Sequence, residues 1–186
     1  MAVDRSRPRR KPPPLDAVKL EELALGYVAR FATSGAKLES YLIRKLRERG
    51  WAGDRPPEPG AVVERFIAAG YIDDEVYARA RSGGLLRRGY GPRRVAQALG
   101  AAGITEEVRE AVRATEAEER RAAVAFASRR KLGPWSRSGR ETDRDTRQKQ
   151  FAAMLRAGHG FEAARAVIEA DSVTAAEEWA AESEES

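Results

Sequence analysis

A pattern of three positions spaced four residues apart and ending in glycine occurs three times, and it constrains the fold more than any other feature of the sequence. The copies are Leu42, Leu46 and Gly50; Val95, Leu99 and Gly103; and Gln150, Met154 and Gly158. Positions four apart share one face of a helix, and glycine takes the left-handed conformation that ends one. The glycines lie 53 and 55 residues apart, a period typical of stacked supersecondary units.

Each unit is too small to bury much apolar surface alone, so we expect the units to stack. The sequence predicts an all-α fold of three tandem three-helix repeats forming an elongated, curved molecule. The predicted divisions are a disordered, basic and proline-rich N-terminus at 1–14, repeats at 15–72, 73–115 and 116–171, and an acidic C-terminal tail at 172–186.

Several local signals refine this division. Asp16 is expected to cap a first helix that extends to about residue 34, and either Asp73 or Asp74 to cap the first helix of the second repeat. Gly83 and Gly84 inside that helix predict a kink or a close helix crossing. In the tail, Thr174 and Glu177 match a capping box, which predicts a short final helix anchored by Trp179.

Composition excludes several classes of function. The sequence has no cysteine and one histidine, which excludes disulfides, thiolate nucleophiles and multi-histidine metal sites. No apolar run approaches the length of a membrane span, and no apolar segment follows the basic N-terminal residues as in a secretory signal. We expect a monomeric cytoplasmic protein without metal or cofactor. Its net charge of +5 and pI of about 9.7 permit an acidic partner.

The strongest candidate for binding such a partner is a run of arginines in the second repeat. Six arginines and no acidic residue occur from 79 to 94; they are Arg79, Arg81, Arg87, Arg88, Arg93 and Arg94. A solvated helical face is one explanation. The other is a contact with an anion or an acidic surface, because unpaired arginines repel one another unless such a group meets them.

Two further basic groups give weaker signals. The equivalent region of the first repeat carries Arg44, Lys45, Arg47 and Arg49 as secondary candidates. Glu48 interrupts this group, which favours a solvated helix. A third group, Arg129 to Lys131, is weaker still because the loop that follows mixes charges of both signs.

Other polar and aromatic residues have simpler explanations than chemistry. Asp73 and Asp74 could bind Mg²⁺, but helix capping accounts for them. His159 follows a helix-ending glycine and is expected to have a packing or surface role. The glycines at 89–92 precede a helix and could hold one phosphate, yet they do not form a nucleotide-binding loop. The tryptophans are scattered among different units, which favours core or loop anchoring over base stacking.

From about residue 20 to 170 the sequence resembles the RecX family of bacterial regulatory proteins. The motifs that carry the resemblance are GYIDD at 70–74 with the following YAR, and RRGYGPRRV at 87–95 with Leu99 and Gly103 after it. The resemblance implies tandem three-helix repeats. It also implies a protein that binds the RecA recombinase in the groove of its filament on single-stranded DNA and inhibits its ATPase, strand-exchange and coprotease activities.

We therefore expect a non-enzymatic regulator that acts in recombination, DNA repair and the SOS response. The alternative is an independent helical DNA-binding module whose affinity comes from phosphate neutralisation. Filament bridging and capping of a growing filament end are both open mechanisms. A further hypothesis is that the acidic tail screens the basic face until a partner displaces it.

Overall fold

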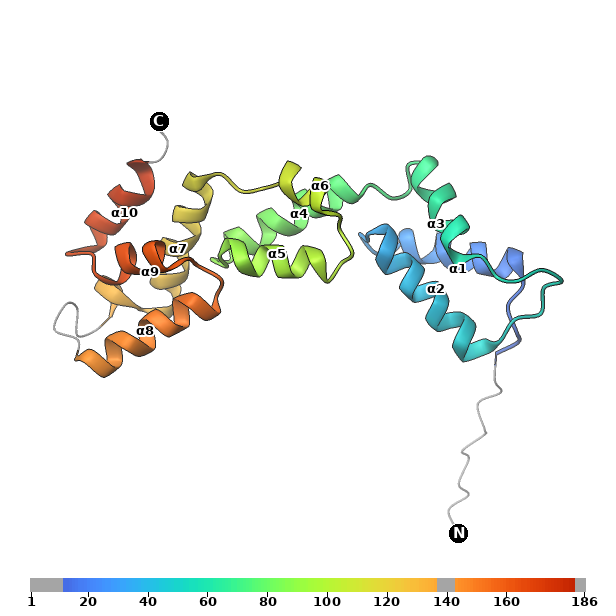
Figure 1. Ribbon diagram of the computed structural model, residues 1–186, viewed down its shortest axis with the longest axis horizontal. Coiled ribbons are helices and arrows are strands. Elements are labelled where there is room, and N and C mark those ends of the chain that lie inside the picture. The colour runs from blue at the N-terminus through green and yellow to red at the C-terminus, as the bar shows by residue number, and fades with distance from the viewer. Residues whose placement is uncertain (1–11, 137–142, 183–186) are drawn as a thin grey trace, which may run out of the picture. The chain divides into compact units, whose positions relative to one another are not determined.

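The computed structural model describes residues 12–136 and 143–182. Over these residues it contains ten α-helices, one 3-10 helix and no strand beyond one isolated bridge (Figure 1), which confirms the predicted all-α fold. The chain divides into two compact units, an N-terminal unit ending at Asp73 and a C-terminal unit starting at Asp74. The helices are α1 Ala17–Val28, α2 Gly35–Arg49, α3 Pro59–Ala68, α4 Asp74–Arg87, α5 Pro92–Gly100, α6 Glu106–Ala111, α7 Glu116–Arg130, η1 Gly133–Trp135, α8 Arg144–Arg156, α9 Phe161–Ile168 and α10 Val173–Ala181.

The N-terminal unit packs α1, α2 and α3 around one apolar core. Asp16 caps α1 as predicted, since its side chain accepts a hydrogen bond from the backbone N–H of Lys19. The helix ends at Val28, six residues earlier than expected. Ser34 instead caps α2 from an extended backbone conformation and accepts from Lys37 N–H, so the chain must leave α1 before it reaches Ser34. Phe31, which follows the end of α1, is 56% exposed.

A short extended segment before α1 closes this unit. Leu15 donates its N–H to the carbonyl of Gly50 at 3.0 Å and accepts from Ala52 N–H at 2.8 Å, forming the isolated bridge to Trp51. Arg49 Nε donates to the carbonyl of Pro13 at 2.9 Å. Pro13 belongs to the segment predicted to be disordered, most of which lies outside the described residues. Within the described part, backbone pairing holds the chain against the end of α2.

In the C-terminal unit, α4, α5 and α6 surround a second core that includes Val95 and Leu99 of the repeated pattern. Thr105 caps α6 by accepting from Val108 N–H, as predicted. Of the two alternatives predicted at Gly83 and Gly84, the close helix crossing is wrong, and the kink stays a prediction. A side chain at Gly84 would meet no atom within 4 Å, and the nearest group to Gly83 is the guanidinium of Arg87 from the same helix.

A third core lies among α7, α8 and α9. Thr115 and Glu118 form a reciprocal capping box at the start of α7. Gln150 occupies the first position of the third repeated pattern, where the other copies have Leu42 and Val95. Its buried side chain accepts a hydrogen bond from Gly133 N–H at 3.0 Å, which explains a polar residue there: it satisfies a backbone donor in the turn after α7.

One prediction for the end of the chain needs correction. In α9, Phe161 is 57% exposed, whereas Val167 and Ile168 are buried. The final helix exists, yet its cap is Ser172, which accepts from Ala175 N–H, and not Thr174. This helix, α10, packs on α7, where Arg120 Nη1 donates to the carbonyl of Trp179 at 3.0 Å and its guanidinium lies 5.0 Å from the Trp179 ring.

The second and third cores are joined by backbone contacts between the turn before α5 and the turn after α8. Gly91 N–H donates to the carbonyl of Ala157 at 2.9 Å, and Arg93 N–H donates to the carbonyl of Gly158 at 3.1 Å. Gly158 has φ +97°, which favours glycine. It is the third repeated glycine, and Gly50 and Gly103 also have positive φ. We call this set of contacts the glycine junction.

Replacing Gly91 should disrupt the glycine junction. A Cβ atom at Gly91 would collide with backbone atoms of Gly158 and His159, and backbone cannot rotate away as a side chain can. We expect Gly91→Ala to lower the free energy of unfolding of the full chain by about 1–3 kcal/mol, measured by urea denaturation.

Gly84→Ala is the matched control, since it lies mid-helix in open space. It should raise the free energy of unfolding by about 0.5–1 kcal/mol. Equal effects of the two substitutions would contradict the close approach at Gly91.

Candidate functional site

All six arginines of the predicted primary site are exposed, but they face different surroundings. Four of them, Arg79, Arg81, Arg87 and Arg88, come from α4 and the turn after it, and the other two from the first turn of α5. Arg79 is paired with Glu75 one turn earlier, so its guanidinium is less available to a binding partner than the run of arginines in the sequence suggested. The other five form no ion pair with the described residues. Helical spacing places Arg79 and Arg87 on one face of α4 and Arg81 on another.

Arg88 lies in a groove that the sequence did not predict. The groove has a volume of about 360 Å³ and lies beside the glycine junction. It is lined by Arg88, Tyr90, Phe126, Arg129, Arg130, Ala153, Arg156 and Ala157. We call it the arginine groove. Its lining within the part of the chain that the structure describes includes four arginines and no carboxylate.

Arg93 borders a different cavity, of about 290 Å³, between α5 and α6. Its lining mixes signs, because Glu106, Glu110 and Glu119 accompany the arginines there. Burial raises the pKa of the Glu119 carboxyl. This cavity shares no lining residue with the arginine groove. Arg88 and Arg93 therefore meet different chemical environments although they are five positions apart.

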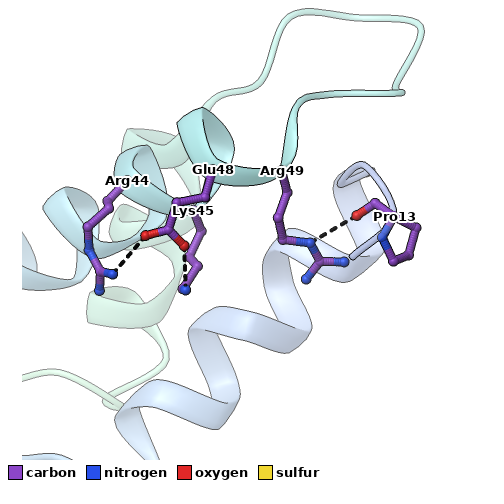
Figure 2. Close-up of polar contacts among 5 residues, drawn as sticks. All are labelled: Pro13, Arg44, Lys45, Glu48 and Arg49. Carbon is purple, nitrogen blue, oxygen red and sulfur yellow. Dashed lines mark hydrogen bonds and ion pairs between the residues drawn. The ribbon is translucent and has the colours of Figure 1, made fainter. Parts of the chain in front are cut away.

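The secondary basic group of the N-terminal unit is largely engaged within the protein (Figure 2). Glu48 accepts hydrogen bonds from Arg44 at 3.0 Å and from Lys45 at 2.6 Å. The hydrogen bond from Lys45 and its charge, with those of Arg44, lower the pKa of Glu48. Arg49 is the residue that holds Pro13, while Arg47 is exposed and has no ion pair within the described residues. These contacts agree with the interpretation of this group as a solvated helix, which the interrupting Glu48 favoured.

Asp73 and Asp74 lie where the capping explanation places them, because α4 begins at Asp74.

Each tryptophan packs against an apolar core, as predicted: Trp51 on that of the N-terminal unit, and Trp135 and Trp179 on the third core. Trp51 Nε1 also donates to the carbonyl of Arg55 at 2.6 Å.

His159 is fully buried, so it is a packing residue and not a surface one. Its Nε2 donates to the carbonyl of Gly89 at 2.9 Å, and its Nδ1 is buried without a partner. The ring also lies 5.7 Å from that of Phe126. Burial lowers the pKa of the imidazole. His159 therefore adds a side-chain contact to the glycine junction in its neutral form.

Sequence reasoning missed most of the arginine groove. In the sequence, Arg129 and Arg130 give only a weak signal because a loop of mixed charges follows them, and Arg156 gives none. Their proximity to Arg88 depends on the packing of α7 and α8 beside the turn before α5, which no local pattern encodes. The repeat gave no signal for this contact, because the third repeated glycine, Gly158, meets the turn at Gly91 and Arg93 and not the second repeated glycine, Gly103.

The described residues contain no group of three or more His, Cys, Asp or Glu side chains that could hold a metal ion. Among them there is also no helix long and apolar enough to cross a membrane. Exposed guanidinium groups on three-helix units are instead the dominant chemistry. Fold and site together define an all-α binding protein built from three-helix units.

Comparison with known proteins identifies the family. The model of the second three-helix domain of RecX matches residues 73–112. The chain is 30% identical over 175 residues to the regulatory protein RecX of Myxococcus xanthus, covering 90% of this chain and 93% of that protein. It is 33% identical over 132 residues to the RecX of Agrobacterium fabrum, covering 68% of each chain. The chain belongs to the RecX family of regulatory proteins and is a non-enzymatic regulator.

Solved structures agree on the fold. The crystal structure of RecX from Lactobacillus salivarius matches with a TM-score of 0.65 and 18% identity, covering 83% of this chain and 95% of that one. A second crystal structure of regulatory protein RecX matches with a TM-score of 0.62 and 22% identity, covering 82% of this chain and 70% of that one.

The neutral, buried His159 predicts a specific pH dependence of stability. Its pKa is lower in the folded chain than in the unfolded chain, so the unfolded state binds a proton first as pH falls. The stabilisation is complete above the ordinary pKa of about 6.5 and is lost as pH falls from there towards the folded pKa, by at most about 1.4 kcal/mol per pH unit.

We expect His159→Gln to be less stable than the parent chain at pH 7 but to lose less stability between about pH 7 and pH 5. Urea denaturation of both proteins across this range measures the difference. Carboxyl groups with a lowered pKa, such as that of Asp16, titrate below this pH range, and they are present in both the parent chain and the variant. Parallel pH profiles would contradict the assignment.

Proposed function

We propose that this chain binds the RecA recombinase as its filament on single-stranded DNA and inhibits the ATPase, strand-exchange and coprotease activities of RecA. The proposal places it in the cytoplasm as a monomer, acting in recombination, DNA repair and the SOS response. Its relatives are named regulatory protein RecX, and that name refers to a modulator of RecA.

The observation that carries the proposal is the set of exposed arginines without carboxylate partners on α4 and α5. Arg81, Arg87, Arg93 and Arg94 are exposed and form no ion pair with the described residues. Exposed guanidinium groups that form no such ion pair are available to bind a carboxylate or a phosphate through two parallel hydrogen bonds. Both groups occur on a protein filament that coats DNA.

Tandem units offer a physical route to tight binding. If successive three-helix units contact successive RecA protomers, each contact after the first is intramolecular and individually weak contacts add up. Bound in this way, the chain would either resist the rearrangement of neighbouring protomers or block the addition of new ones at a filament end. Both mechanisms require the same arginine contacts.

The test is ATP hydrolysis by preformed RecA filaments on single-stranded DNA, with this chain added well below one molecule per protomer. We expect strong inhibition by the parent chain. Replacing Arg81, Arg87, Arg93 and Arg94 by glutamine should raise the concentration for half-inhibition at least about tenfold. A tenfold change equals about 1.4 kcal/mol, within the range of one charge-assisted hydrogen bond.

A control of equal net charge replaces Arg30, Arg55, Arg144 and Arg165 by glutamine. These residues are exposed and lie outside the predicted site, so the control should inhibit like the parent chain. Equal loss in both variants would attribute the effect to net charge and overturn the assignment to α4 and α5. Inhibition that appears only once the DNA itself is coated would favour the independent DNA-binding module instead.

A further inference from the structure

The arginine groove has the composition of a binding site for a polyanion. Arg88, Arg129, Arg130 and Arg156 come from three separate segments of the chain and converge on one groove of about 360 Å³. Among the described residues, no carboxylate lines the groove to neutralise them. Holding four like charges around one space is unfavourable unless an anion occupies it.

One of these arginines is held in place by the backbone. Arg129 Nη2 donates to the carbonyl of Arg87 at 2.7 Å, which ties the end of α7 to the end of α4. This bond uses only one N–H of the guanidinium, and the rest stay available for a ligand. Arg130 and Arg156 are exposed and form no ion pair with the described residues, so their guanidinium groups are free to bind an anion.

The rest of the groove lining is apolar and partly aromatic. Tyr90 and Phe126 are half-buried, and Ala153 and Ala157 complete the lining. The Phe126 ring lies beside the glycine junction, where it contacts His159, so core packing fixes its position. Basic and aromatic side chains together are the combination that binds single-stranded nucleic acids, with phosphates on the basic groups and bases on the rings.

We infer that the arginine groove binds the phosphate backbone of single-stranded nucleic acid directly. A polynucleotide supplies evenly spaced charges that several arginines can bind at once, and a single strand also exposes its bases to the aromatic lining. The inference goes beyond the proposed function because it concerns contact with nucleic acid in the absence of RecA.

The experiment measures the fluorescence anisotropy of a labelled oligo-dT of about 20 nucleotides titrated with the full chain at several salt concentrations. The groove variant is Arg130→Gln with Arg156→Gln, which removes two predicted phosphate contacts and no side-chain hydrogen bond to another described residue. The control of equal charge is Arg30→Gln with Arg165→Gln, whose exposed side chains lie outside the groove.

Each phosphate contact on a single strand contributes about 0.7 to the slope of log K against log salt concentration. The groove variant should therefore lower the slope by about 1.4 and weaken binding about tenfold or more near 0.1 M salt, while the control matches the parent chain. Poly-glutamate of the same total charge should compete poorly with oligo-dT for the parent chain.

Two results would overturn the inference. Equal affinity and equal slope for the groove variant and the control would show that nucleic acid does not occupy the groove. Equal competition by poly-glutamate would show that the groove takes acidic protein side chains as readily as phosphates. Because RecA is absent throughout, either result leaves the regulation of RecA to be decided by the ATPase assay.

Discussion

The C-terminal unit depends on the close approach of two glycine turns. Gly91 and Gly158 bring the turn before α5 against the turn after α8 closely enough that a single Cβ atom would separate them. The buried His159 adds a hydrogen bond to Gly89 at the same place. This contact decides which arginines become neighbours, because it sets α7 and α8 beside the end of α4. The apolar cores give each group of helices its stability, and the glycine junction gives the unit its basic surface.

Much of the fold could be predicted from the sequence because its signals are local. The cap at Asp16 and the repeated glycines act over three or four residues, and the structure has them where expected. Failures occurred where one local signal competed with another. Ser34 was taken as the end of α1, but its side chain caps α2. Nothing local showed that Phe161 would be exposed, since burial depends on what packs against the helix.

The candidate site was less predictable for the same physical reason. The sequence shows a run of arginines but not how it divides. Arg79 is paired with Glu75, Arg93 borders a cavity that glutamates also line, and Arg88 lines a groove with arginines from α7 and α8. Charge along the chain therefore predicted which segment carries basic residues but not which of them act together.

The most direct test of the account is hydrogen exchange of the full chain with and without RecA filaments on single-stranded DNA. If exposed arginines of the C-terminal unit make the contact, amides in α4 and α5 and around the arginine groove should exchange more slowly when filaments are present. Protection confined to α1, α2 and α3, with α4 and α5 unchanged, would contradict the central claim and move the interface to the N-terminal unit.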